Sequence, residues 1–135
     1  MNIEEKVLAI FNILEDVYGY SPWSIEQIIK DIKSPESDYF FVYHNSEMVG
    51  FLSLQRLMGE IEITNLAVMR AYQGKSFGKF LLNQLDTEIE PIFLEVRASN
   101  DVAQGLYKRA RFQEVGRRKS YYHNPVEDAI IMKRD

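Results

Sequence analysis

A break in the alternation of polar and apolar side chains between residues 60 and 68 restricts the fold more than any other feature of the sequence. In this segment, EIEITNLAV, isoleucine alternates with glutamate and threonine as far as Thr64, and the apolar positions then continue one residue out of phase from Leu66. Side chains of a β-strand alternate strictly between the two faces of a sheet, so this shift indicates a β-bulge that bends the strand away from a neighbour. We therefore expect two strands to separate near Thr64 and Asn65.

Periodicity predicts two helices and a hairpin before this strand. Residues 1–18 carry apolar side chains at helical spacing, and Ser24 with Gln27 forms a capping box at the start of a second helix. Two runs rich in aromatic and β-branched residues, 39–43 and 48–54, flank the turn sequence HNSE and predict a β-hairpin.

The second half of the chain alternates helices with strands. Apolar spacing predicts helices over 77–89 and around 102–107, a short buried strand at 92–96, and closing strands at 112–118 and 129–132. The strand, helix and strand within residues 60–96 favour parallel neighbours joined by a right-handed connection. The predicted class is α/β (α+β), with a mixed central sheet that is flanked by helices and splayed at the bulge.

The composition is that of one compact domain over residues 1–135, with no internal repeat or linker. Apolar residues make up 46% of the chain and charged residues 27%, as in ordinary globular domains. The absence of cysteine excludes disulfides, thiolate metal ligands and a cysteine nucleophile. His44 and His123 are far apart in the sequence, so we expect no metal site.

Charge and hydropathy narrow the class of partner. No stretch approaches the roughly 18 apolar residues of a membrane span, and no basic region leads into an apolar segment at the N-terminus, so we expect a cytoplasmic protein without membrane contact. A net charge of −4 argues against a nucleic-acid partner. It is compatible with a basic substrate, although charge at this level more often serves solubility. None of these features specifies an oligomeric state.

The segment AYQGKSFGKFLL, residues 71–82, connects the bulged strand to the next helix. Its small residues let successive backbone N–H groups turn toward one point at the start of a helix, where the helix dipole also favours an anion. It lacks the pattern of a nucleotide-hydrolysing P-loop and the spacing of the dinucleotide-binding fingerprint. The residues alone are equally compatible with a phosphate cradle and with an ordinary strand-to-helix connection.

Several motifs together resemble the GNAT superfamily of N-acetyltransferases. The pattern Q-x-x-G-x-G after a bulged strand, here residues 73–78, is similar to the pyrophosphate loop of these enzymes. LEVRASN, at 94–100, is the most specific of the motifs, and it is similar to the ribosomal-protein-alanine acetyltransferases in particular. The similarity covers most of the chain from Ser21 onward, and it extends to GEIEITNLAV (59–68), the pair Leu106 and Tyr107, and EDAIIM (127–132).

The resemblance implies a co-substrate and a set of binding residues. In such enzymes the bulge holds two parallel strands apart, and the pantetheine arm of acetyl-CoA lies in the gap. The backbone of Leu66, Ala67 and Val68 would pair with this arm and polarise the thioester carbonyl, a role worth roughly 3 to 4 kcal/mol per donor. Asn100 matches a position that contacts the cofactor, and it is also placed to cap a helix. The residues that would hold the pyrophosphate are Gln73, Gly74, Lys75, Ser76, Phe77, Gly78 and Lys79.

Glu95 interrupts the apolar run at 92–96. A desolvated carboxylate has a raised pKa and can act as a base near neutral pH. An amine acceptor requires such a base, because an α-amino group with a pKa of about 8 is largely protonated at pH 7. The residues alone leave an alternative, in which Glu95 pairs with Arg97 on the same strand face. The match of LEVRASN to the family favours the base.

Tyr107 matches the general acid of the family. A phenol with a pKa of about 10 can donate a proton to a departing thiolate, whose thiol has a pKa of about 8.5, without a large mismatch. The residues alone allow a packing role instead. The implied reaction is direct: the amine, after losing a proton to Glu95, attacks the thioester, and Tyr107 protonates the coenzyme sulfur. No covalent acyl-enzyme is needed, in agreement with the absence of cysteine.

Three positions depart from the family pattern. Ser76 occupies the place of a loop glycine, where a positive φ would strain the serine or shift the loop; its hydroxyl could equally donate to a phosphate. Arg111 replaces the glycine that ordinarily ends a helix in the left-handed conformation, so we expect that cap to be made differently. The first strand of the superfamily is missing or reduced to residues 1–3.

The acceptor depends on the resemblance, which implies the N-terminal alanine of a small-subunit ribosomal protein. Other protein N-termini, a lysine or a small amine remain open, as does a catalytically weakened acyl-CoA-binding module, against which the presence of Glu95 and Tyr107 argues. Residues 117–119 (RRK) fit contact with the coenzyme's 3′-phosphate or a solvated strand face. Tyr121 and Tyr122 fit the border of a substrate groove or cross-strand packing.

Overall fold

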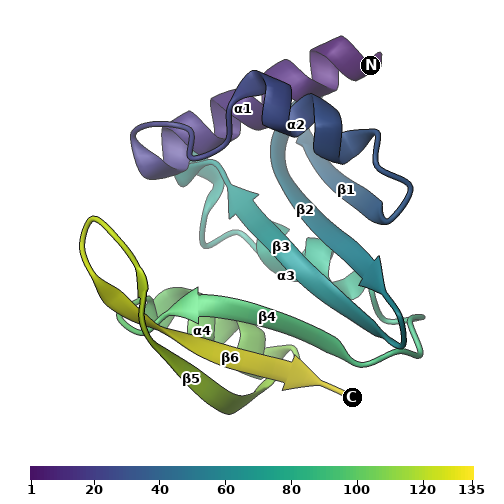
Figure 1. Ribbon diagram of the computed structural model, residues 1–135. Helices are drawn as coiled ribbons and strands as arrows, with labels where there is room; N and C mark the ends of the chain where they lie inside the picture. Colours follow the sequence, from purple (N-terminus) through teal and green to yellow (C-terminus); the bar gives the residue numbers. More distant parts are fainter.

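The chain folds into a six-stranded mixed sheet with helices on both faces (Figure 1). The strand order across the sheet is β1-β2-β3-β4-β6-β5, and this architecture confirms the predicted element order and class. The computed structural model describes residues 1–135, with the elements α1 (Ile3–Tyr18), α2 (Ile25–Ile32), β1 (Ser37–His44), β2 (Glu47–Leu57), β3 (Glu60–Val68), the 3₁₀ helix η1 (Arg70–Tyr72), α3 (Phe77–Asn83), β4 (Ile92–Arg97), α4 (Asp101–Arg109), β5 (Gln113–Tyr122) and β6 (Glu127–Arg134).

The central strands β3 and β4 are parallel, and they separate after two residue pairs. Ile61 lies opposite Ile92 and Glu62 opposite Phe93, and no later residue of β3 pairs with β4. Figure 1 shows the two strands diverging toward their C-terminal ends. The sheet is therefore open along most of this seam.

The bulge predicted from the sequence lies where the strands begin to diverge. Across β2 and β3, Ser53 pairs with Asn65 whereas Leu54 pairs with Ile63, so Thr64 is the extra residue. Its hydroxyl lies 2.8 Å from that of Ser53, which is fully buried. One additional residue on β3 increases the local bend, and this bend turns the strand away from β4.

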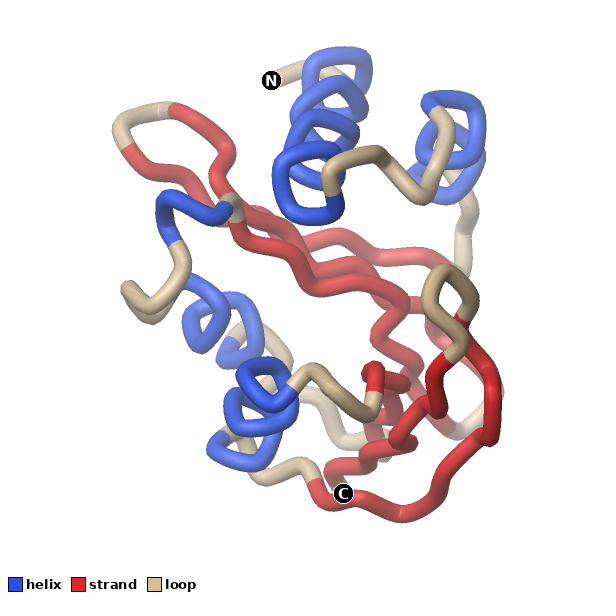
Figure 2. The backbone as a smooth tube through the Cα atoms, turned by 90° about the vertical axis from the view of Figure 1, so that its left-hand side faces the viewer, coloured by secondary structure: helices blue, strands red, loops and turns tan.

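Helices cover the two faces of the sheet unequally (Figure 2). On one face, α1 and α2 pack over β1, β2 and β3 only. Their core consists of Val7, Ile10, Ile13, Leu14, Ile28, Met48, Phe51 and Ala67. On the other face, α3 and α4 cover a larger core that spans both halves of the sheet, including Leu52, Leu54, Ile61, Leu81, Leu94, Val96, Tyr107, Phe112 and Met132. The face of β4 that is turned toward the α1 side is consequently left without a helix.

Local hydrogen bonds explain the helix starts. The predicted capping box of α2 is confirmed, because Gln27 N–H donates to Ser24 Oγ at 3.1 Å and Ser24 N–H to Gln27 Oε1 at 2.8 Å. Asn2 caps α1 in the same way, with Glu5 as its partner. Helix α1 is the first element of the structure, and β1 forms an edge of the sheet. None of the helices has the length and apolar character needed to cross a membrane.

Two predictions about helix ends were wrong. Helix α3 ends at Asn83 and does not continue to Ile89, which is 91% exposed, because bonds of the i→i+3 type tighten the chain from Gln84 onward. Arg111 does not require a different cap: it adopts the left-handed conformation itself, with φ of 75°. Its N–H donates to Lys108 O, and that of the next residue to Tyr107 O, both at 3.0 Å, which is a Schellman motif.

Candidate active site

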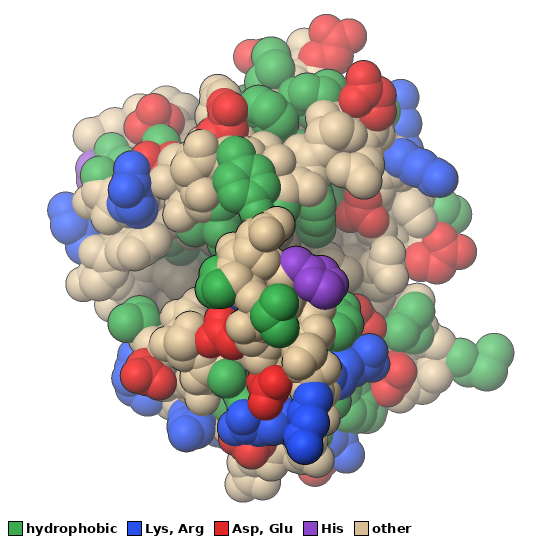
Figure 3. Space-filling view, turned by 60° about the vertical axis from the view of Figure 1, so that its left-hand side comes forward, with side chains coloured by type: hydrophobic (Ala, Val, Ile, Leu, Met, Phe, Trp, Pro, Cys, Tyr) green, Lys and Arg blue, Asp and Glu red, His purple; other side chains and the backbone are tan.

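A hollow of about 220 Å³ lies where β3 and β4 separate. Figure 3 brings that side of the molecule forward and shows the surface hollowed beneath the layer of α1 and α2. The lining residues come from three strands: Glu62, Ile63 and Thr64 of β3, Glu95 of β4, and Tyr121 and Tyr122 of β5. Two carboxylates and two phenols thus line one small space.

Glu95 faces this hollow because its neighbours on β4 face the core. Leu94 and Val96 are 2% and 6% exposed and pack beneath α3 and α4, so alternation along the strand turns Glu95 to the opposite face. The Oε2 atom is buried and has no hydrogen-bond partner. The Arg118 Nε lies 3.3 Å from it without the geometry of a hydrogen bond. A buried carboxylate oxygen that lacks a donor is uncommon in proteins and calls for an explanation.

The alternative pairing of Glu95 with Arg97 is wrong. The Arg97 guanidinium instead lies 3.2 Å from Glu127 Oε1, at the start of β6. Glu127 has a second donor, the Ser99 N–H at 2.6 Å. The Ser99 hydrogen bond and the Arg97 charge lower the pKa of Glu127. Arg97 is therefore committed to the β5–β6 turn and leaves Glu95 to Arg118.

Tyr107 lies on α4, on the opposite face of the sheet, and is not among the residues that line the hollow. The side chain is 7% exposed, and its ring packs edge-on against Phe112 at a centroid distance of 5.8 Å. Burial raises the pKa of the Tyr107 phenol above its ordinary value, and Tyr18 and Tyr122 add to the rise. The phenol therefore keeps its proton near neutral pH, and its pKa lies further from that of a thiol than the ordinary phenol value of about 10 implies.

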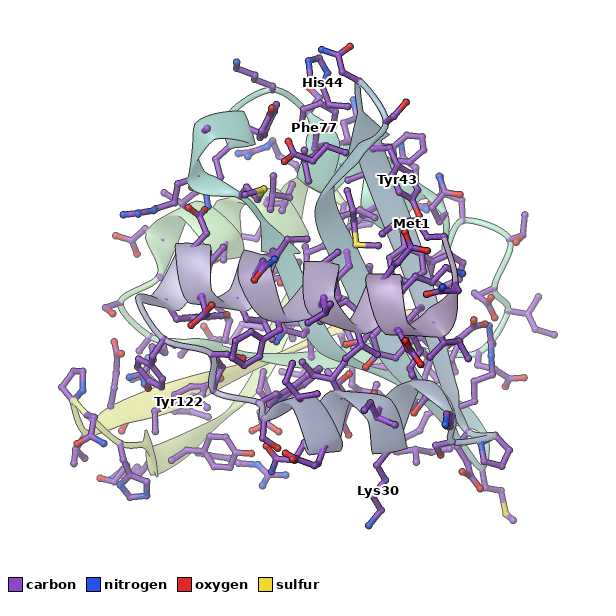
Figure 4. All side chains as sticks on the ribbon, turned by 90° about the horizontal axis from the view of Figure 1, so that it is seen from above. Met1, Lys30, Tyr43, His44, Phe77 and Tyr122 are labelled. Carbon is purple, nitrogen blue, oxygen red and sulfur yellow. The ribbon has the colours of Figure 1, made fainter.

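Tyr122 interacts electrostatically with both Glu95 and Tyr107. Burial, followed by the charge of Glu95, raises the pKa of Tyr122 to about 12. Tyr122 in turn contributes to the raised pKa of Tyr107. Tyr122 thus lies within electrostatic reach of Glu95, Tyr107 and Tyr18. In Figure 4, Tyr122 lies on the same side of the molecule as the C-terminal end of α1, which Tyr18 terminates.

The backbone of β3 beyond the bulge has free groups on the side of β4. Leu66, Ala67 and Val68 pair with Leu52, Phe51 and Gly50 of β2 on one side only. Such groups need a partner, and an extended ligand lying along the seam can supply it. These three residues therefore fit the amide-rich pantetheine arm of coenzyme A.

The loop after β3 forms a cradle of backbone donors. Six consecutive N–H groups, of residues 74–79, have no acceptor within the protein, and the first backbone bond of α3 is from Phe80 N–H to Ser76 O. Gly74 and Ser76 both have positive φ, of 76° and 69°, which curls the loop. Gln73 braces the loop, because its side-chain amide donates to Val68 O at 2.9 Å. This arrangement fits a pyrophosphate.

Ser76 adopts the left-handed backbone conformation that the sequence analysis identified as a source of strain. Its φ is in the left-handed region, and its side chain makes no capping hydrogen bond. The hydroxyl is therefore unused within the protein.

Asn100 performs the structural role predicted for it. Its Oδ1 accepts a hydrogen bond from the Ala103 N–H at 3.1 Å and caps α4. Contact with a cofactor remains a prediction for this residue.

Three residues near the hollow were missed by the sequence analysis. Glu62 and Thr64 belong to the polar face of β3, which the alternation of residues 60–64 made visible, but no local signal placed that face over a hollow. Arg118 was considered only as a phosphate contact or a solvated side chain. Its approach to Glu95 depends on β5 and β4 both pairing with β6, which a single sequence does not reveal.

A larger hollow, of about 650 Å³, lies between β1 and α3. Phe41 and Tyr43 line one side, and Lys75, Lys79 and Phe80 line the other. His44 and Phe77 meet next to it, with ring centroids 6.1 Å apart (Figure 4). Neither Glu95 nor Tyr107 lines this hollow, so we do not take it as the candidate site of chemistry despite its size.

Comparison with known proteins agrees with this geometry. Residues 7–112 match the acetyltransferase (GNAT) family. The N-alpha-acetyltransferase RimI of Mycobacterium tuberculosis is 34% identical over 123 residues, which cover 87% of this chain and 78% of the relative. The ribosomal protein bS18-alanine N-acetyltransferase of Escherichia coli K12 is 34% identical over 131 residues, covering 92% of this chain and 87% of the relative. The crystal structure of the ribosomal-protein-S18-alanine N-acetyltransferase from Escherichia coli has a TM-score of 0.87 at 29% identity, over 99% of this chain and 89% of that one. On these grounds, and as its motifs predicted, the chain belongs to the GNAT family of acetyltransferases.

Proposed function

We propose that this protein is an acetyl-CoA-dependent Nα-acetyltransferase that acetylates the N-terminal alanine of a small-subunit ribosomal protein, bS18. GNAT acetyltransferases use acetyl-CoA. The Mycobacterium tuberculosis and Escherichia coli relatives, named for Nα-acetylation and for bS18-alanine acetylation, support the acceptor.

The observation that carries the proposal is the orphaned Oε2 of Glu95. This oxygen is buried, lacks a hydrogen-bond donor and faces the hollow between the splayed strands. Arg118 Nε, 3.3 Å away, offsets the charge of this oxygen without donating a hydrogen bond, and an incoming ammonium or amine N–H would supply that bond. Glu62 lines the same hollow and adds negative charge that favours a cationic acceptor.

When bound, acetyl-CoA supplies an activated acetyl thioester and a thiol leaving group. The backbone of Leu66, Ala67 and Val68 would hold the pantetheine arm, and an N–H of this segment would stabilise negative charge on the thioester oxygen. Residues 74–79 would hold the pyrophosphate with backbone donors, and the side chains of Lys75 and Lys79 add positive charge there.

Protons balance between two residues in the proposed reaction. Glu95 accepts the proton that the ammonium must lose before its nitrogen can attack. A C–N bond then forms, the nitrogen loses its second proton, and the C–S bond breaks; this second proton replaces the one that Tyr107 gives to the sulfur. Tyr107 holds a proton on its phenol at neutral pH and delivers it to the departing sulfur. No side chain becomes acylated, so turnover requires no cysteine, and the chain contains none.

Steady-state transfer to a panel of peptides that differ in their first residue tests the proposal. We expect the wild type to prefer an alanine start, in particular the N-terminal sequence of bS18. Transfer to polyamines or internal lysines, with none to alanine-starting peptides, would contradict the proposed acceptor.

The variant Glu95→Gln tests the base. We expect turnover to fall by roughly 10² to 10⁴ at neutral pH while acetyl-CoA still binds, because amide and carboxylate have the same shape and only the proton acceptor is lost. The matched control is Glu114→Gln, which removes an exposed carboxylate from β5 outside the hollow. Equal turnover of the two variants would remove Glu95 from the mechanism.

A further inference from the structure

The Arg97 side chain joins the end of β4 to the turn between β5 and β6. Its Nη1 donates to Pro125 O at 3.1 Å and to Glu127 Oε1 at 3.2 Å, and its Nη2 donates to His123 O at 3.0 Å. One guanidinium therefore holds two backbone carbonyls and one carboxylate of the same turn. Because a guanidinium is planar and presents several donors in fixed directions, it fixes the position of the turn more closely than an ammonium can.

The turn has few other attachments to the sheet. The pairing of β5 with β6 is irregular between Arg118, which lies opposite Ala129, and Tyr122, which lies opposite Glu127. Nearly every residue of β5 is exposed. Ser120 is held by Asp128 within the hairpin, but that bond does not reach β4. Three donors of the chain following Glu95 tie this region down: the Arg97 side chain, the Ser99 N–H, and the Ala98 N–H, which donates to Asp128 O at 3.0 Å; of these, only Arg97 reaches residues 123–125.

The same guanidinium lies beneath a wall of the hollow. The Arg97 Cζ is 4.5 Å from the centroid of the Tyr122 ring, a cation–π distance. Tyr122 lines the hollow together with Glu95, and its ring meets Tyr121 edge-on at 5.1 Å. Arg97 therefore supports the Tyr122 ring, whereas Tyr121 packs against Arg118, whose Cζ is 5.4 Å from the Tyr121 ring centroid.

We propose that Arg97 is a positioning residue for the acceptor: it holds the β5–β6 turn so that Tyr122 forms a wall of the acceptor pocket beside Glu95. This inference depends on the proposed function, in which that hollow receives the acceptor amine. The pyrophosphate cradle of residues 74–79 belongs to a different segment. Loss of Arg97 should therefore affect binding of the peptide and leave binding of acetyl-CoA unchanged.

Steady-state kinetics of the full chain with an alanine-starting peptide tests this role. For Arg97→Ala we expect the peptide KM to rise about tenfold, as for loss of a cation–π contact and charge-assisted hydrogen bonds, with kcat within about threefold and the acetyl-CoA KM unchanged. Arg97→Lys retains the charge without the planar donor set and should give an intermediate KM.

Arg56→Ala is the matched control. Arg56 also makes three side-chain hydrogen bonds, to Glu88 and Asp38, and its side chain is 41% exposed compared with 33% for Arg97. It lies away from the hollow, so it should leave the peptide KM unchanged. A similar rise in KM for Arg56→Ala would mean that loss of a surface network alone explains the effect, and would overturn the proposal.

Two further measurements separate positioning from general destabilisation. In a Tyr122→Ala background, Arg97→Ala should add little to the peptide KM, because the two changes remove the same wall; full additivity would overturn the proposal. Amide hydrogen exchange of residues 120–128 should become faster in Arg97→Ala and stay unchanged in Arg56→Ala. Unchanged exchange in both would show that Arg97 does not hold the turn.

Failure of the proposed function would be seen before any variant is compared. If the wild type transfers acetyl to no peptide, the acceptor assignment fails, and this inference fails with it. If the wild type is active and Arg97→Ala lowers kcat at constant peptide KM, the acceptor assignment stands and the positioning role is overturned.

Discussion

The substitution Tyr107→Phe should separate catalysis from stability, because the hydroxyl and the ring of Tyr107 have different partners. The ring is buried and packs edge-on against Phe112. The backbone carbonyl of the same residue accepts the Phe112 N–H that closes the helix. Phenylalanine keeps both interactions and removes only the oxygen.

The effect on stability should be small. The Tyr107 hydroxyl makes no hydrogen bond within the protein, and it is not a buried unpartnered atom, so it keeps contact with solvent and its removal leaves no group unsatisfied. Removing it should leave the free energy of unfolding unchanged within about 1 kcal/mol or raise it. The effect on turnover should be large, because a general acid contributes roughly 10² to 10⁴ in rate, which corresponds to about 3 to 5 kcal/mol of activation free energy.

Release of the coenzyme thiol measures turnover directly. The chain contains no cysteine, so a thiol-reactive dye reports only the coenzyme that is released. Urea unfolding of the same samples measures stability. Tyr39→Phe is the matched control: it removes a hydroxyl that donates to Asp31, and it should lower stability by about 1 to 2 kcal/mol at constant kcat.

Two results would refute this reasoning. A kcat for Tyr107→Phe within threefold of the wild type would show that the phenol is not the acid. A loss of more than about 2 kcal/mol of stability would show that the hydroxyl has a structural role, contrary to its lack of partners.

Three other predictions follow from the same geometry. Arg111→Gly should raise the free energy of unfolding by up to about 1 kcal/mol in urea titrations, because relief of left-handed strain of roughly 1 to 2 kcal/mol exceeds the entropic cost of ordering a glycine. Arg111→Ala keeps the strain and should give no gain. Glu62→Gln should raise the KM of a cationic acceptor about three- to tenfold without changing the acetyl-CoA KM, and the difference should shrink in high salt; an unchanged acceptor KM would exclude Glu62 from recognition. Stability should fall as the pH rises above about 10, because the Tyr107 phenol then loses its proton in the unfolded chain but keeps it in the folded chain, where its pKa is raised. Unfolding titrations of Tyr107→Phe should show a smaller loss of stability over that range, and an equal loss would contradict the raised pKa of Tyr107.

Local patterns predicted the features that depend on neighbouring residues. The bulge at Thr64 was readable because strand alternation has a fixed period, and the capping box of Ser24 because its two partners are three residues apart. Glu95 was identified because a charge interrupts an apolar strand, whereas its role as the base depends on the resemblance to the family and stays a prediction. These features lie within a few residues of the signals that predicted them.

Features that depend on distant segments were not predictable. Arg118 reaches Glu95 only because β4 and β5 both pair with β6, and Arg97 is drawn from Glu95 to Glu127 by the same arrangement. Helix α3 was overextended because Ile89 continues the apolar spacing, although tight i→i+3 turns intervene. At Arg111, the tertiary contact between Tyr107 and Phe112 outweighs the intrinsic preference for glycine.

The two-pair junction between β3 and β4 would also couple the folding equilibrium to the supply of the proposed co-substrate, acetyl-CoA. Beyond Glu62 and Phe93 the two strands do not pair with each other, so the central seam contributes fewer hydrogen bonds than any other strand boundary of the sheet. A ligand that takes the place of the missing ladder binds only the folded chain. At a hundred times its dissociation constant it would add about 2.7 kcal/mol to the free energy of unfolding. The cellular lifetime of this protein would then follow the concentration of the co-substrate proposed for it.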